Sequence, residues 1–583
     1  MSIAIKQPGD KKSEKAIPPF HTADSTISKY LLDRLLTLGV KHIFGVPGDY
    51  ILKLNKRIEE HEMAFINTTR EHTAGYMADA YARLQGLAAV CITYGVGISV
   101  ANAIAQAYVE SCPVVVISGS VSHDEFAKCP HLHHLINTSS STRRDRTQME
   151  IFKQITVAQA VLNDPVTAAA EIDQVIETCL REQKPVYIEI PRNMVDSEIP
   201  EHHYIPTPTK KSDPDELLEA TAKIGKVIEQ SKRPFIWLGH EVQRHNLRQQ
   251  LLAFAEKFHI PIVSTLLGKT AISERHPLYS GIYIGEISRP EVREFVEGCD
   301  CAIHCGVVLN DVNTGLLSAK IDHDHRVILN ETTVAVDNRT YEKVVWKEAL
   351  KSLAKIDSNK RFKINYPANI DRQPPVFSAS KTKPLTATSL YNAIEKNLSH
   401  DHILIADIGD VLFGTADYTL EQDCYLSSAY YATVGFAIPA AIAAQIYSPK
   451  KRVIAVVGDG AFQMTGTELS TALRFGADPI VIVVNNHGYS MERPIVEGTF
   501  NDIVNWNYSK VTELLGGGKG ILATTEDEFA EALTQALGER GTPYIIEVSL
   551  DKSDISPGMA RFADIINRKT ATTEPGKGST HAT

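Results

Sequence analysis

Residues 452–492 read RVIAVVGDGAFQMTGTELSTALRFGADPIVIVVNNHGYSME and carry the most informative pattern in the chain. An apolar run, Val453–Val457, leads directly into the turn Gly458-Asp459-Gly460, and a second apolar run ends in Asn485-Asn486. Continuous Val/Ile runs separated by a helical stretch are typical of parallel strands that are buried on both faces. Because the carboxyl ends of such strands meet at one edge of the sheet, we expect Asp459 and Asn486 to lie close together.

The oxygen donors at this edge are those that Mg²⁺ prefers. The carboxylate of Asp459, the side-chain amide of Asn486 and the backbone carbonyl of Gly488 would supply half of an octahedral shell, which phosphate oxygens and water can complete. The glycine turn also leaves backbone N–H groups open to an anion. The pattern therefore predicts a diphosphate that is held through a metal ion. The spacing of this segment matches neither a Walker loop nor a dinucleotide fingerprint.

The alternation of apolar runs and helical stretches continues over the rest of the chain. It predicts an α/β protein of three successive parallel-sheet domains. We place these domains at residues 23–198, 215–356 and 385–565. Polar segments rich in Pro, Thr and Lys predict the connections and the ends of the chain. We expect linkers at 199–214 and 357–384, and polar tails at 1–22 and 566–583.

Composition excludes several classes of protein. The chain has 583 residues, of which 43% are hydrophobic and 22% charged, which argues against disorder along its whole length. The formal net charge of -10 argues against nucleic acid as the main partner. The apolar runs are all shorter than the roughly 18–20 residues of a membrane span. Eight cysteines without paired spacing, and a first segment without the apolar core of a secretory signal, predict a cytoplasmic protein.

The motif at residues 458–460 and 485–486 resembles the diphosphate-binding motif of thiamine diphosphate enzymes. The resemblance covers about residues 23–564 and is to the 2-oxo acid decarboxylase branch, which contains pyruvate, indolepyruvate and phenylpyruvate decarboxylases. Overall likeness is greatest to the bacterial phenylpyruvate decarboxylases. Further matching stretches are Gly45–Asp49, Arg70–His72, Ala78–Arg83, His133–His134 and His487–Glu492. The three domains would then be pyrimidine-binding, middle and diphosphate-binding domains.

This resemblance implies a reaction, two cofactors and an assembly. The reaction is the non-oxidative decarboxylation of a 2-oxo acid to an aldehyde and CO₂ through an enamine on thiamine diphosphate, with Mg²⁺ as the metal and carboligation as a side activity. In the family the first domain of one chain meets the third domain of another. A homodimer or homotetramer with active sites between chains is therefore implied, with a small 2-oxo acid as substrate and neither nucleic acid nor membrane as partner.

The resemblance also assigns catalytic roles. Glu71 matches the glutamate that hydrogen-bonds the pyrimidine ring and activates the cofactor. Without the resemblance, a carboxylate at the start of a helix would be read as complementing the helix dipole. Asp49, His133, His134 and Glu492 match the acid and base groups that surround the substrate cavity, and imidazoles suit proton transfer near neutral pH.

Further residues match contacts to the cofactor. Val434 matches the aliphatic residue that holds the cofactor in its bent form, and the carbonyl of Ala432 would accept a hydrogen bond from the aminopyrimidine. The diphosphate end is assigned to Asp459, Gly460, Ala461, Asn486 and Gly488. Relatives often have Ser where this chain has Ala461, so only the backbone N–H is left there. Asp410 stands where Thr is frequent and is a further candidate contact.

Substrate size is inferred from three apolar residues. Leu412 occupies a position where relatives dedicated to pyruvate often have Trp, and Met491 and Ile495 would flank the same pocket. An aliphatic pocket that contains Met is roomy and adaptable. It favours phenylpyruvate, indolepyruvate or a branched 2-oxo acid over pyruvate, with overlapping activities because apolar pockets discriminate modestly.

Several alternatives stay open at this point. The chain could be a pyruvate decarboxylase or a carboligase such as an acetohydroxyacid synthase, although the histidine pair speaks against the latter. A silent metabolite-binding protein on this scaffold would be expected to lose Glu71 or Asp459. The histidines at 131, 133 and 134 could bind zinc, but no acidic or Cys partner lies at ligand spacing in the sequence. The stretch 137–146 could be a mobile cover, an effector-responsive loop or solvated charge.

Overall fold

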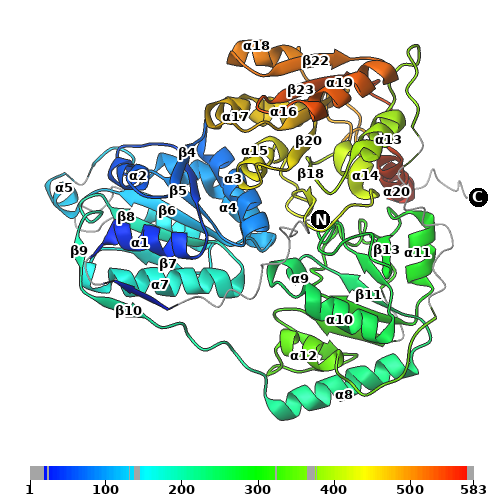
Figure 1. Cartoon of the computed structure of the whole chain (residues 1–583), viewed down its shortest axis with the longest axis horizontal. Helices are drawn as coiled ribbons and strands as arrows, with labels where there is room; N and C mark the ends of the chain where they lie inside the picture. Colours follow the sequence, from blue (N-terminus) through cyan, green and yellow to red (C-terminus); the bar gives the residue numbers. More distant parts are fainter. Residues whose placement is uncertain are drawn as a thin grey trace, which may run out of the picture.

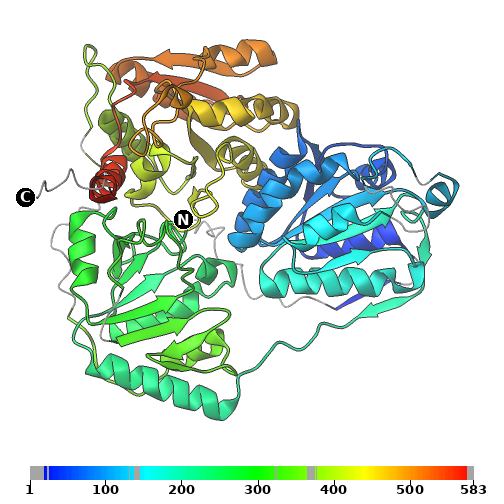
Figure 2. The same cartoon turned by 180° about the vertical axis from the view of Figure 1, so that it is seen from behind.

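The structure is a computed structural model, and it describes residues 19–22, 25–129, 131–136, 145–321, 325–363, 375 and 377–573. Three α/β domains follow one another along the chain, coloured blue to cyan, green, and yellow to red in Figure 1. Each is built on its own mainly parallel sheet covered by helices. The predicted fold class of three successive α/β domains is therefore confirmed. Figure 2 shows the same arrangement from behind.

The first domain has a six-stranded parallel sheet with the order β4-β3-β5-β6-β8-β7. Its central strands are fully buried Val/Ile-rich runs, as expected for a sheet with helices on both faces. The strands are β3 (His42–Gly45), β4 (Ala64–Asn67), β5 (Ala88–Ile92), β6 (Val114–Ser120), β7 (Gln159–Val161) and β8 (Val186–Pro191). The helices are α1 (Ile27–Thr37), α2 (Leu52–Glu59), α3 (Glu71–Gln85), α4 (Ala101–Val109), α5 (His123–Lys128), α6 (Thr147–Lys153) and α7 (Pro165–Glu182), with a 3₁₀ turn at Val96–Val100.

The middle domain has a seven-stranded sheet with the order β13-β12-β11-β14-β15-β16-β17. Its first five strands are parallel, and the last two return as antiparallel neighbours that the sequence did not predict. The strands are β11 (Pro234–Leu238), β12 (Ile262–Ser264), β13 (Tyr279–Ile282), β14 (Cys301–Cys305), β15 (His325–Leu329), β16 (Val334–Val336) and β17 (Arg339–Thr340). The helices are α8 (Pro214–Gln230), α9 (Glu241–Arg244), α10 (Arg248–Phe258), α11 (Pro290–Glu297) and α12 (Trp346–Leu353).

The third domain repeats the strand order of the first. Its sheet runs β19-β18-β20-β21-β23-β22, which is the same order of second, first, third, fourth, sixth and fifth strand. The strands are β18 (His402–Ala406), β19 (Tyr425–Leu426), β20 (Arg452–Gly458), β21 (Ile480–Asn485), β22 (Lys519–Ala523) and β23 (Tyr544–Ser549). The helices are α13 (Ala387–Asn397), α14 (Asp410–Ala416), α15 (Ala437–Tyr447), α16 (Asp459–Thr465), α17 (Leu469–Phe475), α18 (Val511–Leu515), α19 (Glu526–Gly538) and α20 (Pro557–Thr573), with 3₁₀ turns at Gly466–Glu468, Thr499–Asn501 and Tyr508–Lys510.

The first and third domains meet through corresponding helices. Helix α3 lies between the second and third strands of its domain, α15 occupies the same place in its own, and the two helices pack side by side (Figure 1). Their buried residues belong to one apolar core that spans both domains. Since α3 begins at Glu71 and α15 follows Val434 closely, this packing brings two proposed cofactor contacts to one region of the molecule.

Local sequence signals explain where several helices begin. Helices α7 and α8 each start with Pro preceded by Asp, and the side chains of Asp164 and Asp213 accept hydrogen bonds from the backbone N–H groups of the first turn. Helix α3 ends at Gly86, whose φ of 101° is the left-handed conformation that favours glycine at a helix end.

Ordered elements extend into two predicted tails and one predicted linker. Strand β1 (Phe20–Thr22) lies in the predicted tail 1–22 and pairs with β10 (His202–Tyr204) from the predicted linker 199–214. Strands β2 (Ser25–Thr26) and β9 (Glu198–Ile199) form a second short ribbon. Helix α20 continues past residue 565 into the predicted tail 566–583. Strands of two or three residues carry no readable period, so the sequence does not reveal the two short ribbons.

Among the helices in the described part of the chain, none is both long enough and apolar enough to cross a bilayer.

Candidate active site

The carboxylate of Asp459 lies at the carboxyl edge of the third sheet, as the sequence predicted. Strands β20 and β21 are parallel neighbours with Gly458 opposite Val484, so the residues that follow them meet at this edge. Asp459 is buried, and it accepts hydrogen bonds from the N–H groups of Gly460 (2.8 Å) and Gly488 (3.0 Å). Burial raises the pKa of Asp459 above its usual value, and the backbone N–H groups act against this rise. A bound cation would stabilise this buried charge.

Asn486 and Gly488 complete the predicted set of oxygen donors. The side chain of Asn486 is buried at the same edge of the sheet, directly after β21. Gly488 has a φ of 137°, and a Cβ atom built there would lie 2.0 Å from the carbonyl oxygen of Asn501, so only glycine fits. One carboxylate, one amide and one backbone carbonyl at this edge fit Mg²⁺, which takes hard oxygen ligands.

The backbone of the phosphate motif is open at Gly458 and closely packed at Gly460. A Cβ atom built on Gly458 meets nothing within 4 Å, whereas one on Gly460 would lie 2.6 Å from the ring of Tyr489. Ala461 is buried in the first turn of α16 and offers only its backbone N–H there. The structure therefore brings the proposed diphosphate contacts together at one edge of the sheet.

Val434 and Ala432 line a cavity of about 360 Å³ between the first and third domains. This volume is within the range of small-molecule sites. The remaining lining residues are His72, Tyr76, Asn102, Tyr431, Thr433, Met464 and Thr465. Burial lowers the pKa of His72, which favours its neutral form, and raises the pKa of Tyr76 to about 12. Ala432 adopts a φ of 60°, which an alanine rarely takes, so the surrounding contacts hold this turn in place.

Two buried carboxylates that the sequence analysis missed hold that turn from both sides. Glu110 at the end of α4 accepts hydrogen bonds from the N–H groups of Tyr430 (2.9 Å) and Tyr431 (2.8 Å). Asp407 after β18 accepts from the N–H groups of Gly435 (2.9 Å) and Ala437 (2.8 Å). Burial raises the pKa of Asp407 to about 6.

Glu110 belongs to a larger buried polar network that joins two domains. Arg83 on α3 donates to Glu110 (2.5 Å), to Asp79 (2.5 Å) and to the carbonyl oxygen of Ser427 (2.8 Å). These side chains are nearly inaccessible to solvent. One signal of this network is present in the sequence: Asp79 and Glu110 are acidic residues within otherwise apolar segments. A carboxylate buried in such a segment requires a buried partner.

Glu71 is the first residue of α3 and is half-buried. Its carboxylate accepts a hydrogen bond from the hydroxyl of Ser99 at 2.8 Å. The neighbouring residue, His72, lines the cavity that also contains Val434. The buried residues of α3 begin at Thr73, on the same turn as Glu71 and His72, so the start of this helix is less covered than its middle.

Asp49, His133 and His134 lie together, as predicted, at the end of the first domain's sheet. Nε2 of His133 is 2.8 Å from Oδ2 of Asp49, and the two imidazole rings lie 4.6 Å apart. The ring of Tyr50 stacks on His133 at 5.1 Å. Asp49 is the acidic partner of the histidines that sequence spacing did not reveal, since it comes from a segment far along the chain. The side chains of Asp49 and His133 are 39% and 62% exposed, so one side of this cluster is open.

The remaining predicted residues separate into two groups. Leu412 on α14 is buried in an apolar cluster, against which Met491 also packs. Glu492 and Ile495 are exposed on the segment that follows, so the structure does not bring Ile495 into the same cluster. Of the stretch 137–146, residues 137–144 lie outside the described residues.

Asp410 was predicted as a cofactor contact, but its carboxylate is engaged within the protein. It is buried at the start of α14 and accepts hydrogen bonds from the N–H group of Ser556 (3.0 Å) and the hydroxyl of Tyr391 (3.2 Å). Burial raises the pKa of Asp410. These contacts indicate a role in fastening the start of α20 to the third domain.

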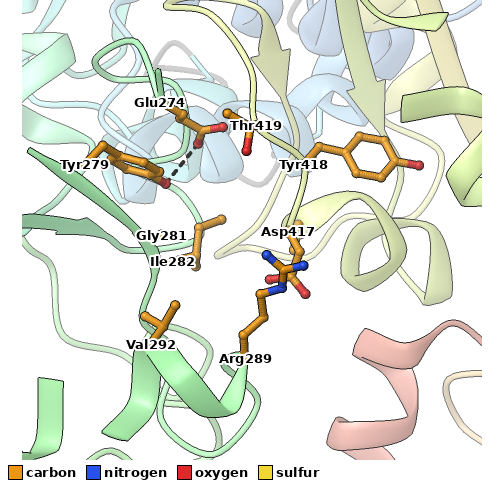
Figure 3. A pocket seen from close by; sticks show the side chains of 10 residues that line it. Glu274, Tyr279, Gly281, Ile282, Arg289, Val292, Asp417, Tyr418 and Thr419 are labelled. Carbon is orange, nitrogen blue, oxygen red and sulfur yellow. Dashed lines mark hydrogen bonds between the residues drawn. The ribbon is translucent and has the colours of Figure 1, made fainter. Parts of the chain in front are cut away.

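A smaller cavity lies between the middle and third domains, as Figure 3 shows. Its volume is about 20 Å³, which is enough for a single water. The hydroxyl of Tyr279 donates to Glu274 at 3.0 Å, and Arg289 lies beside Asp417. This cavity is too small to be a substrate site.

Family models match all three domains. The model described as thiamine pyrophosphate enzyme, N-terminal TPP binding domain matches residues 25–149, that of the central domain matches 221–354, and that of the C-terminal TPP binding domain matches 407–548. The first match includes Glu71, the second includes the sheet of the middle domain, and the third includes Asp459.

Curated relatives match over nearly the whole chain. The pyruvate decarboxylase of Candida glabrata is 33% identical over 85% of this chain and 89% of that protein. The indole-3-pyruvate decarboxylase of Azospirillum brasilense is 33% identical over 92% of this chain and 97% of that protein. The alpha-keto-acid decarboxylase of Mycobacterium avium is 32% identical over 91% and 94%, respectively. The chain therefore belongs to the thiamine pyrophosphate-dependent 2-oxo acid decarboxylases.

Proposed function

We propose that this enzyme converts larger 2-oxo acids, such as phenylpyruvate or indolepyruvate, to the aldehyde and CO₂ in preference to pyruvate. The observation that carries the proposal is the apolar cluster that contains Leu412 and Met491. Its other members include Phe413, Met559 and Phe562, the last two from α20. A wall of aliphatic and Met side chains accepts a large apolar substituent and adapts its shape to it.

The residues at the edge of the third sheet suit the two cofactors. Asp459, Asn486 and the carbonyl of Gly488 would hold Mg²⁺, and the backbone near Gly460 and Ala461 would contact the diphosphate. When bound, thiamine diphosphate supplies a carbon nucleophile and accepts the electron pair released with CO₂. Val434 and the carbonyl of Ala432 would orient the aminopyrimidine ring, and Glu71 would hold a proton at the pyrimidine nitrogen.

Proton transfer at the substrate is assigned to the four remaining groups. The hydrogen bond between Asp49 and His133 connects a carboxylate to an imidazole, which can accept a proton on one ring nitrogen and release it from the other. His134 lies beside this pair, and we place Glu492 across the substrate cavity from it. These groups would deliver the proton that the product carbon requires before the aldehyde leaves.

We further propose that each active site is completed by a second chain, as a homodimer or a pair of dimers. Exposed apolar side chains surround both proposed half-sites. Leu52, Val96 and Ile136 are 50–55% exposed near the histidine pair, and Val496 and Phe500 are 58% and 66% exposed near Glu492. Decarboxylation needs a site from which water is excluded, and such apolar surfaces mark contacts between proteins.

A cytoplasmic location is proposed from the thiols. All eight cysteines are free, and seven of them are buried. Free thiols are typical of a reducing compartment.

A panel of 2-oxo acids tests the substrate proposal. With saturating Mg²⁺ and thiamine diphosphate, kcat/KM should be at least about 10-fold higher for phenylpyruvate or indolepyruvate than for pyruvate, since an apolar pocket discriminates by about 1–3 kcal/mol. Replacing Leu412 by Trp should reverse this order by filling the pocket. Aldehyde and CO₂ are measured together, so that carboligation appears as missing aldehyde. A wild-type preference for pyruvate would refute the proposal.

A second prediction concerns the turn that carries Val434. Gln in place of Glu110 has one acceptor oxygen and one N–H₂ group. In either orientation of the amide, the N–H₂ group faces donors, either those of Arg83 or the N–H groups of Tyr430 and Tyr431, so buried donors are left unpaired. We expect the Kd of thiamine diphosphate to rise about 10-fold at saturating Mg²⁺. The exposed pair Thr167–Glu171 offers a matched control, Glu171→Gln, which should leave the Kd unchanged. Loss of thermal stability without loss of cofactor affinity would show that Glu110 is merely structural.

A further inference from the structure

We propose a second metal site, separate from the active site, in which His21, Glu201 and His203 bind Zn²⁺. The three side chains come from the short ribbon formed by β1 and β10. His21 and His203 are directly opposite one another in this antiparallel pair, so their side chains leave the same face of the ribbon. Glu201 precedes β10, and one oxygen of its carboxylate lies near a ring nitrogen of each histidine.

The geometry of the three donor atoms fits a tetrahedral ion. Nε2 of His21 is 3.0 Å and Nε2 of His203 is 3.3 Å from the same oxygen, Oε1 of Glu201. All three donor atoms lie within 4.8 Å of one another, and the two rings are 4.1 Å apart. Zinc ligands at about 2.0–2.1 Å in a tetrahedron are separated by about 3.3–3.4 Å, so an ion could bind here with small side-chain movements.

The donor types select the metal. Two imidazole nitrogens and one carboxylate oxygen are the ligands of Zn²⁺ and of similar transition metals, whereas Mg²⁺ and Ca²⁺ prefer oxygen ligands alone. The fourth position would hold water, because the three side chains are 49–63% exposed.

The opposite face of the ribbon explains why the ligands are held in place. His202 points the other way, where its Nε2 lies 3.0 Å from Oδ2 of Asp173 on α7 and its ring packs edge-on against Tyr30. The ribbon is thereby fixed to the first domain beside α7 (Figure 1), away from α3 and the third domain. A bound ion would fasten the strand before this domain to the strand after it.

This site is distinct from the other candidate group. Asp49, His133 and His134 also have donor atoms within 4.8 Å of one another, but they belong to the candidate active site.

The test must therefore count metal ions with the active site left intact. The full-length enzyme is stripped of metal, reloaded with Mg²⁺ and thiamine diphosphate, and titrated with Co²⁺ as a coloured substitute for Zn²⁺.

The expected result is a difference of one ion per chain between wild type and variants. Wild type should take up one more Co²⁺ than His203→Ala and Glu201→Gln, with the visible absorption of a tetrahedral complex, and Zn²⁺ should displace it. His400→Ala is the control, because His400 also forms a surface pair with an acidic residue, Asp401, but belongs to no group of three ligand atoms among the described residues. Unchanged 2-oxo acid turnover in the variants shows that they are folded. Equal Co²⁺ uptake by wild type and His203→Ala would overturn the proposal.

Discussion

Replacing Glu71 by Gln is expected to lower kcat by about 10²–10⁴-fold, the range that proton transfer by a positioned side chain supplies. Gln has the size of Glu but cannot hold a proton at the pyrimidine nitrogen, so the activation of the cofactor is lost while its binding is kept. The hydroxyl of Ser99, which donates to Glu71, can donate equally to the amide oxygen of Gln. The start of α3 should therefore keep its geometry.

The measurement compares turnover with cofactor binding. Steady-state kcat is determined at saturating thiamine diphosphate and Mg²⁺, and the cofactor Kd is measured separately by equilibrium dialysis. Glu59→Gln at the exposed end of α2 serves as the control, because it changes the same chemical group outside the site. Turnover at the wild-type level would show that Glu71 does not activate the cofactor.

Replacing Asp459 by Asn should weaken the joint binding of Mg²⁺ and thiamine diphosphate by more than about 100-fold. Replacing a residue that only hydrogen-bonds to a metal ligand typically lowers metal affinity about 10–100-fold. Asp459 is proposed as a direct ligand, so its replacement should have a larger effect. The change removes the only carboxylate among the proposed ligands. It also turns an N–H₂ group toward Gly460 or Gly488, whose N–H groups both donate to Asp459 in the structure.

The control for this variant comes from the same edge of the sheet. Asp551 follows β23, is exposed, and accepts a hydrogen bond from the N–H group of Ser553 at 2.9 Å. Asp551→Asn should bind both cofactors as wild type does. If Asp459→Asn retained normal affinity for Mg²⁺ and thiamine diphosphate, the metal would have to lie elsewhere.

The two inactive variants together test the proposed assembly. In a dimer of one Glu71→Gln chain and one Asp459→Asn chain, one shared site carries both changes and the other carries neither. Random mixing of subunits should thus restore about a quarter of wild-type activity. Sites built within single chains would give no recovery.

The sequence predicted best those parts of the site that local pattern determines. Asp459 and Asn486 follow two long Val/Ile runs, and parallel strands place their carboxyl ends together whatever the rest of the chain does. Asp49 and the histidine pair were grouped by resemblance to the family, and their contact depends on segments far apart in the sequence. That contact had no local signal.

Other features could not be predicted because their partners are distant backbone groups. Glu110 and Asp407 accept hydrogen bonds from backbone N–H groups of the turn that carries Val434. No residue type in the sequence marks that turn as their partner. The contact of Asp410 had no sequence signal for the same reason, since the N–H group that donates to it belongs to Ser556, 146 residues away. The exposure of Glu71 depends on which segments cover the first turn of α3, which a helical pattern does not describe.

The shared strand order of the first and third domains has an evolutionary consequence. Two sheets with the same sequence of crossovers, joined through equivalent helices, are what duplication of one ancestral gene segment would leave behind. Such an ancestor would have paired with itself through the helix now represented by α3 and α15. After duplication, one copy could specialise in binding the ring of the coenzyme and the other in binding its phosphates. The two binding roles would then have arisen later than the shared fold.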